Sequence, residues 1–135
     1  MEDQEITQAQ DENLKLAQYY KAEFENFKRR NQDATSKAYN DGKEVAILQI
    51  LSIGDSLQEA LKACSHDREG IEILIRKFSQ TLTGLGVVEI PSVGEPFDPK
   101  FHDAVAGTGD TIAEEFQRGY MLGTKLLRPS LVRVG

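Results

Sequence analysis

Proline is missing from the first two thirds of this 135-residue chain, because all four prolines lie between Pro91 and Pro129. Proline interrupts helix interiors, so its absence leaves everything before about residue 86 free to be helical. The remaining residues combine glycine and proline with short apolar runs, which is typical of a β-rich module. The distribution of proline therefore predicts a helical region followed by a small β domain.

Cysteine and long apolar runs are also scarce. The single Cys64 excludes an internal disulfide, and no signal peptide is evident, so we expect a bacterial cytoplasm, or an organelle matrix after removal of a transit peptide. No apolar run approaches the roughly 20 residues that span a bilayer. The net charge of −6 disfavours binding to nucleic acids and anionic membranes in general. We expect neither as a partner.

Residues 1–44 carry apolar and amide side chains at alternating spacings of three and four, which is a heptad pattern. The polar members make the pattern too weak to support a lone helix, so a second copy in a parallel coiled coil is the favoured partner. A single solvated helix is the alternative. The residues of this segment that we predict at the dimer interface are Ala17, Tyr20, Phe24, Phe27 and Asn31.

Residues 45–86 contain two broadly apolar helical segments separated by the turn sequence CSHDREG. Gly42 and Gly54 predict a bend or break in the first segment, and the glycines at 84 and 86 predict the end of the second. Two helices cannot enclose a core, so this region predicts a four-helix bundle built from two chains. Its predicted interface residues are Leu51, Leu57, Leu61, Ile75 and Phe78.

Residues 87–135 contain short apolar runs separated by Gly, Pro and Asp turns, at 86–90, 102–107, 111–123, 125–129 and 130–134. They predict a small, mostly antiparallel sheet or sandwich, which gives an α+β chain. No acidic residue follows Glu115, whereas four basic residues do, namely Arg118, Lys125, Arg128 and Arg133. This basic end favours docking to an acidic partner.

Signatures of catalysis are mostly missing, since no phosphate-binding glycine loop and no zinc-ligand spacing occur. The segment GEPFDPKFHDAV, residues 94–105, holds Asp98 and His102, which could form a carboxylate-oriented histidine of a small hydrolase. No nucleophile accompanies them, so we favour a histidine that packs and hydrogen-bonds within the β domain. We expect no enzyme activity, no metal and no cofactor.

Two segments resemble the signature of a known family. GEPFDPKFHDAV is similar to a family motif F-D-P-x-x-H-x-A-V, and GYMLGTKLLRPSLVRV to the G-Y and L-R-P-S/A-x-V that follow it. The family is GrpE, the nucleotide exchange factors of DnaK-type chaperones, and the resemblance extends from about residue 15 to the end. It implies a parallel dimer with a long paired helix, a four-helix bundle and two β-wings.

The resemblance also implies a function and a set of contacts. One β-wing would enter the ATPase domain of the chaperone and open its nucleotide cleft, so that ADP leaves. The partner-contacting residues implied by position are Lys28, Lys37, Lys62, Ala63, Phe97, Pro99, Phe116, Lys125 and Val134. Lys28 and Lys125 occupy positions where arginine is common in the family. The alternative to exchange is a coiled-coil holdase that binds unfolded chains directly.

Overall fold

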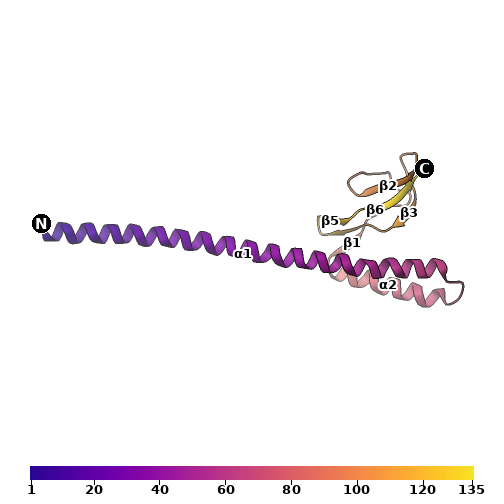
Figure 1. The fold of residues 1–135 in the computed structure, drawn as a ribbon, viewed down its shortest axis with the longest axis horizontal. Helices are drawn as coiled ribbons and strands as arrows, with labels where there is room; N and C mark the ends of the chain where they lie inside the picture. Colours follow the sequence, from indigo (N-terminus) through magenta and orange to yellow (C-terminus); the bar gives the residue numbers. More distant parts are fainter. The chain divides into compact units, whose positions relative to one another are not determined.

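The structure is a computed structural model that describes residues 1–135. Two helices precede six strands, as Figure 1 shows, and this order confirms the α+β class. Their bounds are α1 (Glu2–Ala63), α2 (Arg68–Gly84), β1 (Val87–Glu89), β2 (His102–Gly107), β3 (Ile112–Gln117), β4 (Tyr120–Leu122), β5 (Lys125–Arg128) and β6 (Ser130–Val134). The chain divides into two compact units, Met1–Lys43 and Glu44–Gly135, which are described separately.

Helix α1 continues through both Gly42 and Gly54, so the interruption predicted at these glycines is wrong. Glycine costs a helix interior only about 1 kcal/mol relative to alanine, and good helix formers on both sides outweigh that cost. Gly54 has a packing role instead. A Cβ atom at this position would lie 2.4 Å from Cε1 of Phe78, so the missing side chain lets α2 pack closely against α1.

The first unit, residues 1–43, is a helical segment with an uncovered aromatic stripe. Tyr20, Phe24 and Phe27 are 61 %, 63 % and 58 % exposed in the single chain. Large apolar side chains left in water are typical of a surface that another protein covers. The coiled-coil dimer stays a prediction, and this exposure is the observation that motivates it.

Helix α2 ends as the glycines predict. The helix stops at Gly84, and Gly86 adopts a left-handed backbone conformation with φ of 84°. Residues with a Cβ atom are disfavoured in this conformation, so glycine is suited to the position. The chain then enters β1 directly, which places the first strand beside the helix that precedes it.

The β-module, defined as residues 87–135, contains two three-stranded sheets with the orders β1-β4-β5 and β2-β6-β3. Three of the four strand pairings are antiparallel, whereas β2 and β6 run parallel. The mostly antiparallel arrangement is therefore confirmed, with one parallel exception. The run 111–123 divides into two strands near Gly119, whose backbone approaches Ser130 so closely that a Cβ atom would lie 2.4 Å from the Ser130 amide nitrogen.

Two apolar clusters hold the second unit together. The helix cluster joins the helices to the first sheet and contains Ile47, Leu51, Leu82, Val87, Tyr120 and Leu127. The sheet cluster joins Ile112, Val132 and Val134, with Phe97 packed against them. Leu51 is fully buried at 0 % exposure inside its own chain. The structure therefore corrects the prediction that places Leu51 at a dimer interface.

The other bundle residues predicted at the interface keep part of their surface. Leu57, Leu61, Ile75 and Phe78 are half-buried in the single chain. Larger exposed areas belong to Ile53, Ile73 and Leu74, which are 57 %, 52 % and 53 % exposed. A bundle dimer would cover these three side chains as well. Neither helix is long and apolar enough to cross a lipid bilayer.

Candidate partner-binding surface

The loop of residues 94–102 is fastened to the beginning of β3 by backbone hydrogen bonds. The amide of Gly94 donates to the Ile112 carbonyl (2.9 Å), the Ile112 amide donates to the Glu95 carbonyl (3.0 Å), and the Phe97 amide donates to the Asp110 carbonyl (2.8 Å). Phe97 is half-buried and packs against the sheet cluster. The loop therefore presents exposed Pro99 from a fixed backbone, while the Phe97 ring mainly anchors it.

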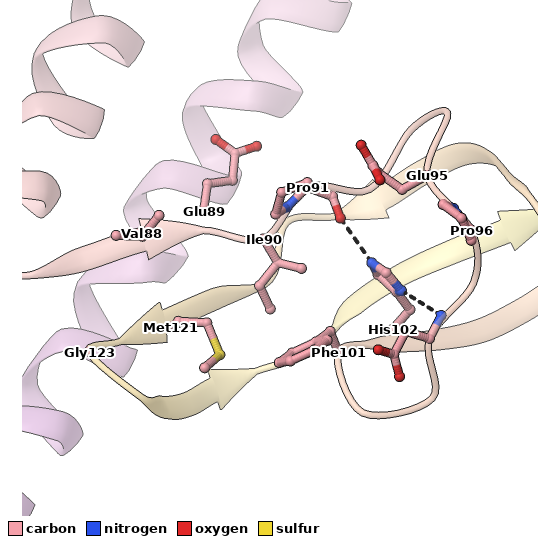
Figure 2. Close-up of a pocket in the computed structure, with 11 residues that line it drawn as sticks. Val88, Glu89, Ile90, Pro91, Glu95, Pro96, Phe101, His102, Met121 and Gly123 are labelled. Carbon is pink, nitrogen blue, oxygen red and sulfur yellow. Dashed lines mark hydrogen bonds between the residues drawn. The ribbon is translucent and has the colours of Figure 1, made fainter.

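His102 braces this loop, and Figure 2 shows its two hydrogen bonds. Nδ1 accepts from the Asp98 amide at 3.0 Å, so the ring proton lies on Nε2, which donates to the Pro91 carbonyl at 2.9 Å. The side chain is 6 % exposed, which confirms the packing interpretation. The Asp98 carboxylate accepts from the Lys100 amide instead (3.0 Å), so the histidine–carboxylate arrangement of the hydrolase alternative is not formed.

A cavity of about 520 Å³ lies between this loop, β1 and the β4–β5 turn (Figure 2). Ile90, Phe101 and Met121 contribute its apolar surface, and none of its lining residues is a lysine or arginine. In Figure 2 the side chains of these three residues point toward one another, and Ile90 directly follows β1. The cavity extends the apolar surface next to the loop that carries Pro99.

A second cleft, of about 400 Å³, brings together two residues that the family resemblance assigns to the partner. Lys62 reaches it from the end of α1, and Phe116 reaches it from β3. Phe116 is 45 % exposed although its ring is large and apolar. Ala63 is exposed next to Lys62. Exposed aromatic rings are enriched at protein interfaces, so Phe116 on this cleft is a candidate contact for a protein partner.

The remaining predicted contact residues are not gathered at this cleft. Lys28 and Lys37 are exposed on α1 in the first unit. Lys125 extends from the start of β5 and forms an ion pair with Glu44 of α1. Val134 is 6 % exposed and belongs to the sheet cluster. Its side chain is therefore part of the core, which corrects its assignment as a partner contact.

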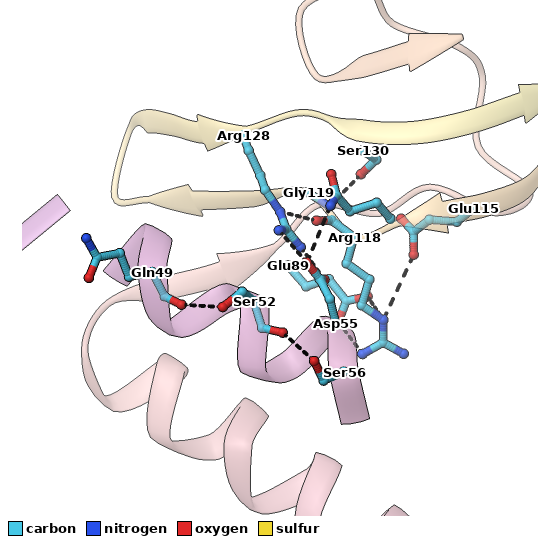
Figure 3. A network of polar contacts seen from close by, with 11 residues as sticks. Gln49, Ser52, Asp55, Ser56, Glu89, Glu115, Arg118, Gly119, Arg128 and Ser130 are labelled. Atoms are coloured by element: carbon cyan, nitrogen blue, oxygen red, sulfur yellow. Dashed lines mark hydrogen bonds and ion pairs between the residues drawn. The ribbon is translucent and has the colours of Figure 1, made fainter. Parts of the chain in front are cut away.

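A polar network that the sequence did not predict connects the β-module to α1 (Figure 3). Arg128 binds both carboxylate oxygens of Asp55, at 2.8 and 2.6 Å. Arg118 lies between Glu89 (3.2 Å) and Glu115 (4.0 Å). The basic residues that follow Glu115 were the available signal, but these two arginines bind acids of their own chain rather than facing outward.

Burial in this network changes two ionisation equilibria. Desolvation raises the pKa of Glu89 above its ordinary value, the Arg118 guanidinium partly opposes this rise, and the Glu115 carboxylate adds to it. Desolvation also raises the pKa of Tyr120, helped by Glu89 and opposed by the two nearby arginines. Tyr120 therefore keeps its hydroxyl proton in the neutral pH range. Cζ of the Arg128 guanidinium lies over this uncharged ring, 5.5 Å from the ring centroid.

Comparison with known proteins agrees with the motifs. The family model described as GrpE matches residues 1–135. Proteins named "Protein GrpE" are similar to the chain over most of its length. The protein from Exiguobacterium sibiricum is 36 % identical over 126 residues, which cover 84 % of this chain and 67 % of the relative. The protein from Caldanaerobacter subterraneus is 38 % identical over 133 residues, covering 91 % and 65 %.

A third relative, from Thermus thermophilus, is 35 % identical over 121 residues, covering 84 % of this chain and 68 % of the relative. The chain thus spans about two thirds of the length of the curated relatives it matches. The full-length family match, the ordered motifs at 94–105 and 119–134, and the helix-then-β-module order all agree. The chain belongs to the GrpE family of co-chaperones.

Proposed function

We propose that this co-chaperone is a nucleotide exchange factor, which binds the ATPase domain of a DnaK-type chaperone, opens its nucleotide cleft and accelerates ADP release. It performs no bond chemistry in this role. The observation that carries the proposal is the GrpE match over residues 1–135, together with a β-module that is packed on helices and presents Pro99 and Phe116 outward. Lys62, at the end of α1, is exposed at the same cleft as Phe116. Such a module can act as a wedge between the lobes of a partner.

We further propose that the functional unit is a homodimer in the cytoplasm. The aromatic stripe of residues 20–27 and the exposed Ile53, Ile73 and Leu74 are the surfaces that a second copy would cover. In this arrangement residues 1–44 form the paired helix, residues 45–86 form the bundle, and residues 87–135 form the wing. The partner contacts proposed on the helix are Lys28 and Lys37.

The direct test measures the release rate of a fluorescent ADP analogue from a purified DnaK-type ATPase domain. We expect a release rate that rises with the concentration of this protein and then saturates. The control is the same titration with an unrelated helical dimer. No acceleration by a folded preparation of this protein, measured with the chaperone of the same organism, would refute the exchange function.

The contact proposed for Lys125 needs a separate control, because this side chain also pairs with Glu44. Lys125→Glu reverses the charge toward the partner, and it also places two carboxylates opposite each other within the chain. The double variant Lys125→Glu with Glu44→Lys restores the internal pair in reversed order. We expect calorimetry to show weak partner binding in both variants. Recovery of affinity in the double variant would mean that Lys125 acts only through Glu44.

A holdase remains the second candidate function because the aromatic stripe on α1 is exposed in the single chain. Apolar side chains on an accessible helix can bind unfolded chains without any ATPase. Light scattering of a heat-denatured client distinguishes the two functions. Suppression of aggregation in the absence of a chaperone favours the holdase, whereas a pure exchange factor should leave the aggregation unchanged.

A further inference from the structure

The β-module is attached to the helices through an apolar contact, the helix cluster. Ile47 and Leu51 of α1 and Leu82 of α2 meet Val87, Tyr120 and Leu127 of the first sheet. Apolar burial favours proximity but has little directional preference, because it depends mainly on the area removed from water. A contact of this kind holds the module against the helices without fixing the angle at which it projects. Some directional interaction has to supply that angle.

Two ion pairs lie on either side of this apolar contact. Glu44 pairs with Lys125, and Asp55 pairs with Arg128. Glu44 and Asp55 are about three helical turns apart, or roughly 16 Å along α1, and therefore share one face of the helix. Ile47 and Leu51 lie between them on that face. Along this face an acidic residue therefore stands at each end and two apolar residues lie between them. The basic partners of the two acids, Lys125 and Arg128, both belong to β5.

The pair between Asp55 and Arg128 has the stronger geometry. Nη1 of Arg128 donates to Oδ2 of Asp55 at 2.8 Å, and Nη2 donates to Oδ1 at 2.6 Å (Figure 3). Nε of the same guanidinium donates to the Arg118 carbonyl at 2.8 Å. The side chains of Arg128 and Asp55 are only 17 % and 29 % exposed. Two parallel bonds between planar groups restrict rotation as well as distance.

We infer that Arg128 is a positioning residue which, by gripping Asp55, sets the angle at which the β-module projects from the helices. The Glu44–Lys125 pair supplies the second fixed point, and the helix cluster between them acts as the pivot. This inference rests on the proposed exchange function for its consequence. A module held at one angle can push on a partner's lobe, whereas a module that pivots would bind without transmitting the same displacement.

The angle can be measured with two spin labels in the full chain. Cys64 lies in the turn after α1 and carries one label, and Thr108→Cys, an exposed site after β2, carries the other. Labelled chains are mixed with an excess of unlabelled chains, so that each dimer holds at most one labelled copy. The reference protein should give one narrow distance distribution by pulsed electron resonance.

Asp55→Asn removes the charge while keeping the shape, and Arg128→Lys keeps the charge while removing the planar fork. We expect both variants to broaden or shift the distance distribution while thermal melts show an intact fold. Asp103→Asn is the matched control, because this aspartate is exposed on β2 and forms no side-chain ion pair. It should leave the distribution unchanged. An unchanged distribution in both test variants would overturn the inference.

The functional consequence has its own readout in the ADP-release titration. A lost positioning contact should lower the maximal release rate at saturating protein several-fold, while the concentration needed for half-saturation changes little. A lost partner contact would instead raise the concentration needed for half-saturation and change the maximal release rate little. A shifted distance distribution with an unchanged maximal rate would overturn the link to exchange. If the unmodified protein accelerated nothing, the exchange function would fail, and the distance measurement would still decide whether Arg128 sets the angle.

Discussion

Replacing Gly54 by alanine tests how closely the two helices pack. In an ordinary helix interior this change stabilises by about 1 kcal/mol, because alanine restricts the unfolded chain. At Gly54 the new methyl group would lie 2.4 Å from Cε1 and 2.9 Å from Cζ of Phe78. Carbon atoms cannot approach so closely, so the aromatic ring or one helix has to move.

Phe78 packs against the helix cluster, so a shift of its ring away from Gly54 disturbs that packing. Adding a methylene-sized group to a packed core typically costs about 1 to 3 kcal/mol. Subtracting the helix-propensity gain leaves a net loss of stability between about 0 and 2 kcal/mol. The expected sign is therefore opposite to that of a standard glycine-to-alanine change in a helix.

Gly42→Ala is the matched control, since Gly42 is in the same helix and a Cβ atom there meets nothing within 4 Å. It should stabilise the helix by about 1 kcal/mol. Urea unfolding followed by circular dichroism at one fixed chain concentration measures both variants. The double variant Gly54→Ala with Phe78→Leu should recover part of the loss. If both single variants stabilised the protein equally, the packing argument would be wrong.

Three further predictions follow from other parts of the chain. Ser130→Ala removes the acceptor of the buried Gly119 amide (3.0 Å) and should cost about 1 to 3 kcal/mol in urea unfolding, whereas the exposed Ser56→Ala should be nearly neutral. The raised pKa of Glu89 means that its stabilising contribution is present below the ordinary glutamate pKa and is lost as the pH rises through the raised value. Between about pH 4 and about pH 7, the melting temperature of Glu89→Gln should therefore rise relative to that of the wild type. Melting temperatures that change with pH in the same way for both proteins would contradict this. Phe24→Asp should weaken the proposed dimer in sedimentation experiments, whereas Tyr39→Asp, which lies outside the predicted seam, should not; equal effects would refute the predicted seam.

The sequence predicts local structure well where a short pattern carries the physical cause. The proline-free heptads predict the first helix, and the glycines at 84 and 86 predict the end of α2, because glycine easily adopts the φ of 84° found at Gly86. The same reasoning was wrong for Gly54. Glycine weakens the helix locally, but the helix formers on both sides outweigh that cost, and the missing side chain allows close packing against Phe78, a residue of the next helix.

The candidate site was less predictable because its determinants are distant in sequence. Asp55 and Arg128 are 73 positions apart, and no local pattern tells which acid a given arginine will meet. The basic residues after Glu115 suggested an outward docking face, yet Arg118, Arg128 and Lys125 all pair with acids of this chain. Val134 was assigned to the partner by resemblance to the family, but its side chain belongs to the core of the β-module.

The polar attachment of the β-module bears on the proposed exchange function through linkage. A protein that binds the open nucleotide cleft better than the closed one weakens ADP by the same factor by which ADP weakens it. Typical couplings are about 1 to 3 kcal/mol, or roughly 5- to 150-fold. A module free to pivot must lose that freedom when it binds, and the loss subtracts from the free energy available for opening the cleft. Two ion pairs that fix the angle beforehand remove this loss, so Arg128 and Asp55 would affect exchange without either side chain touching the partner.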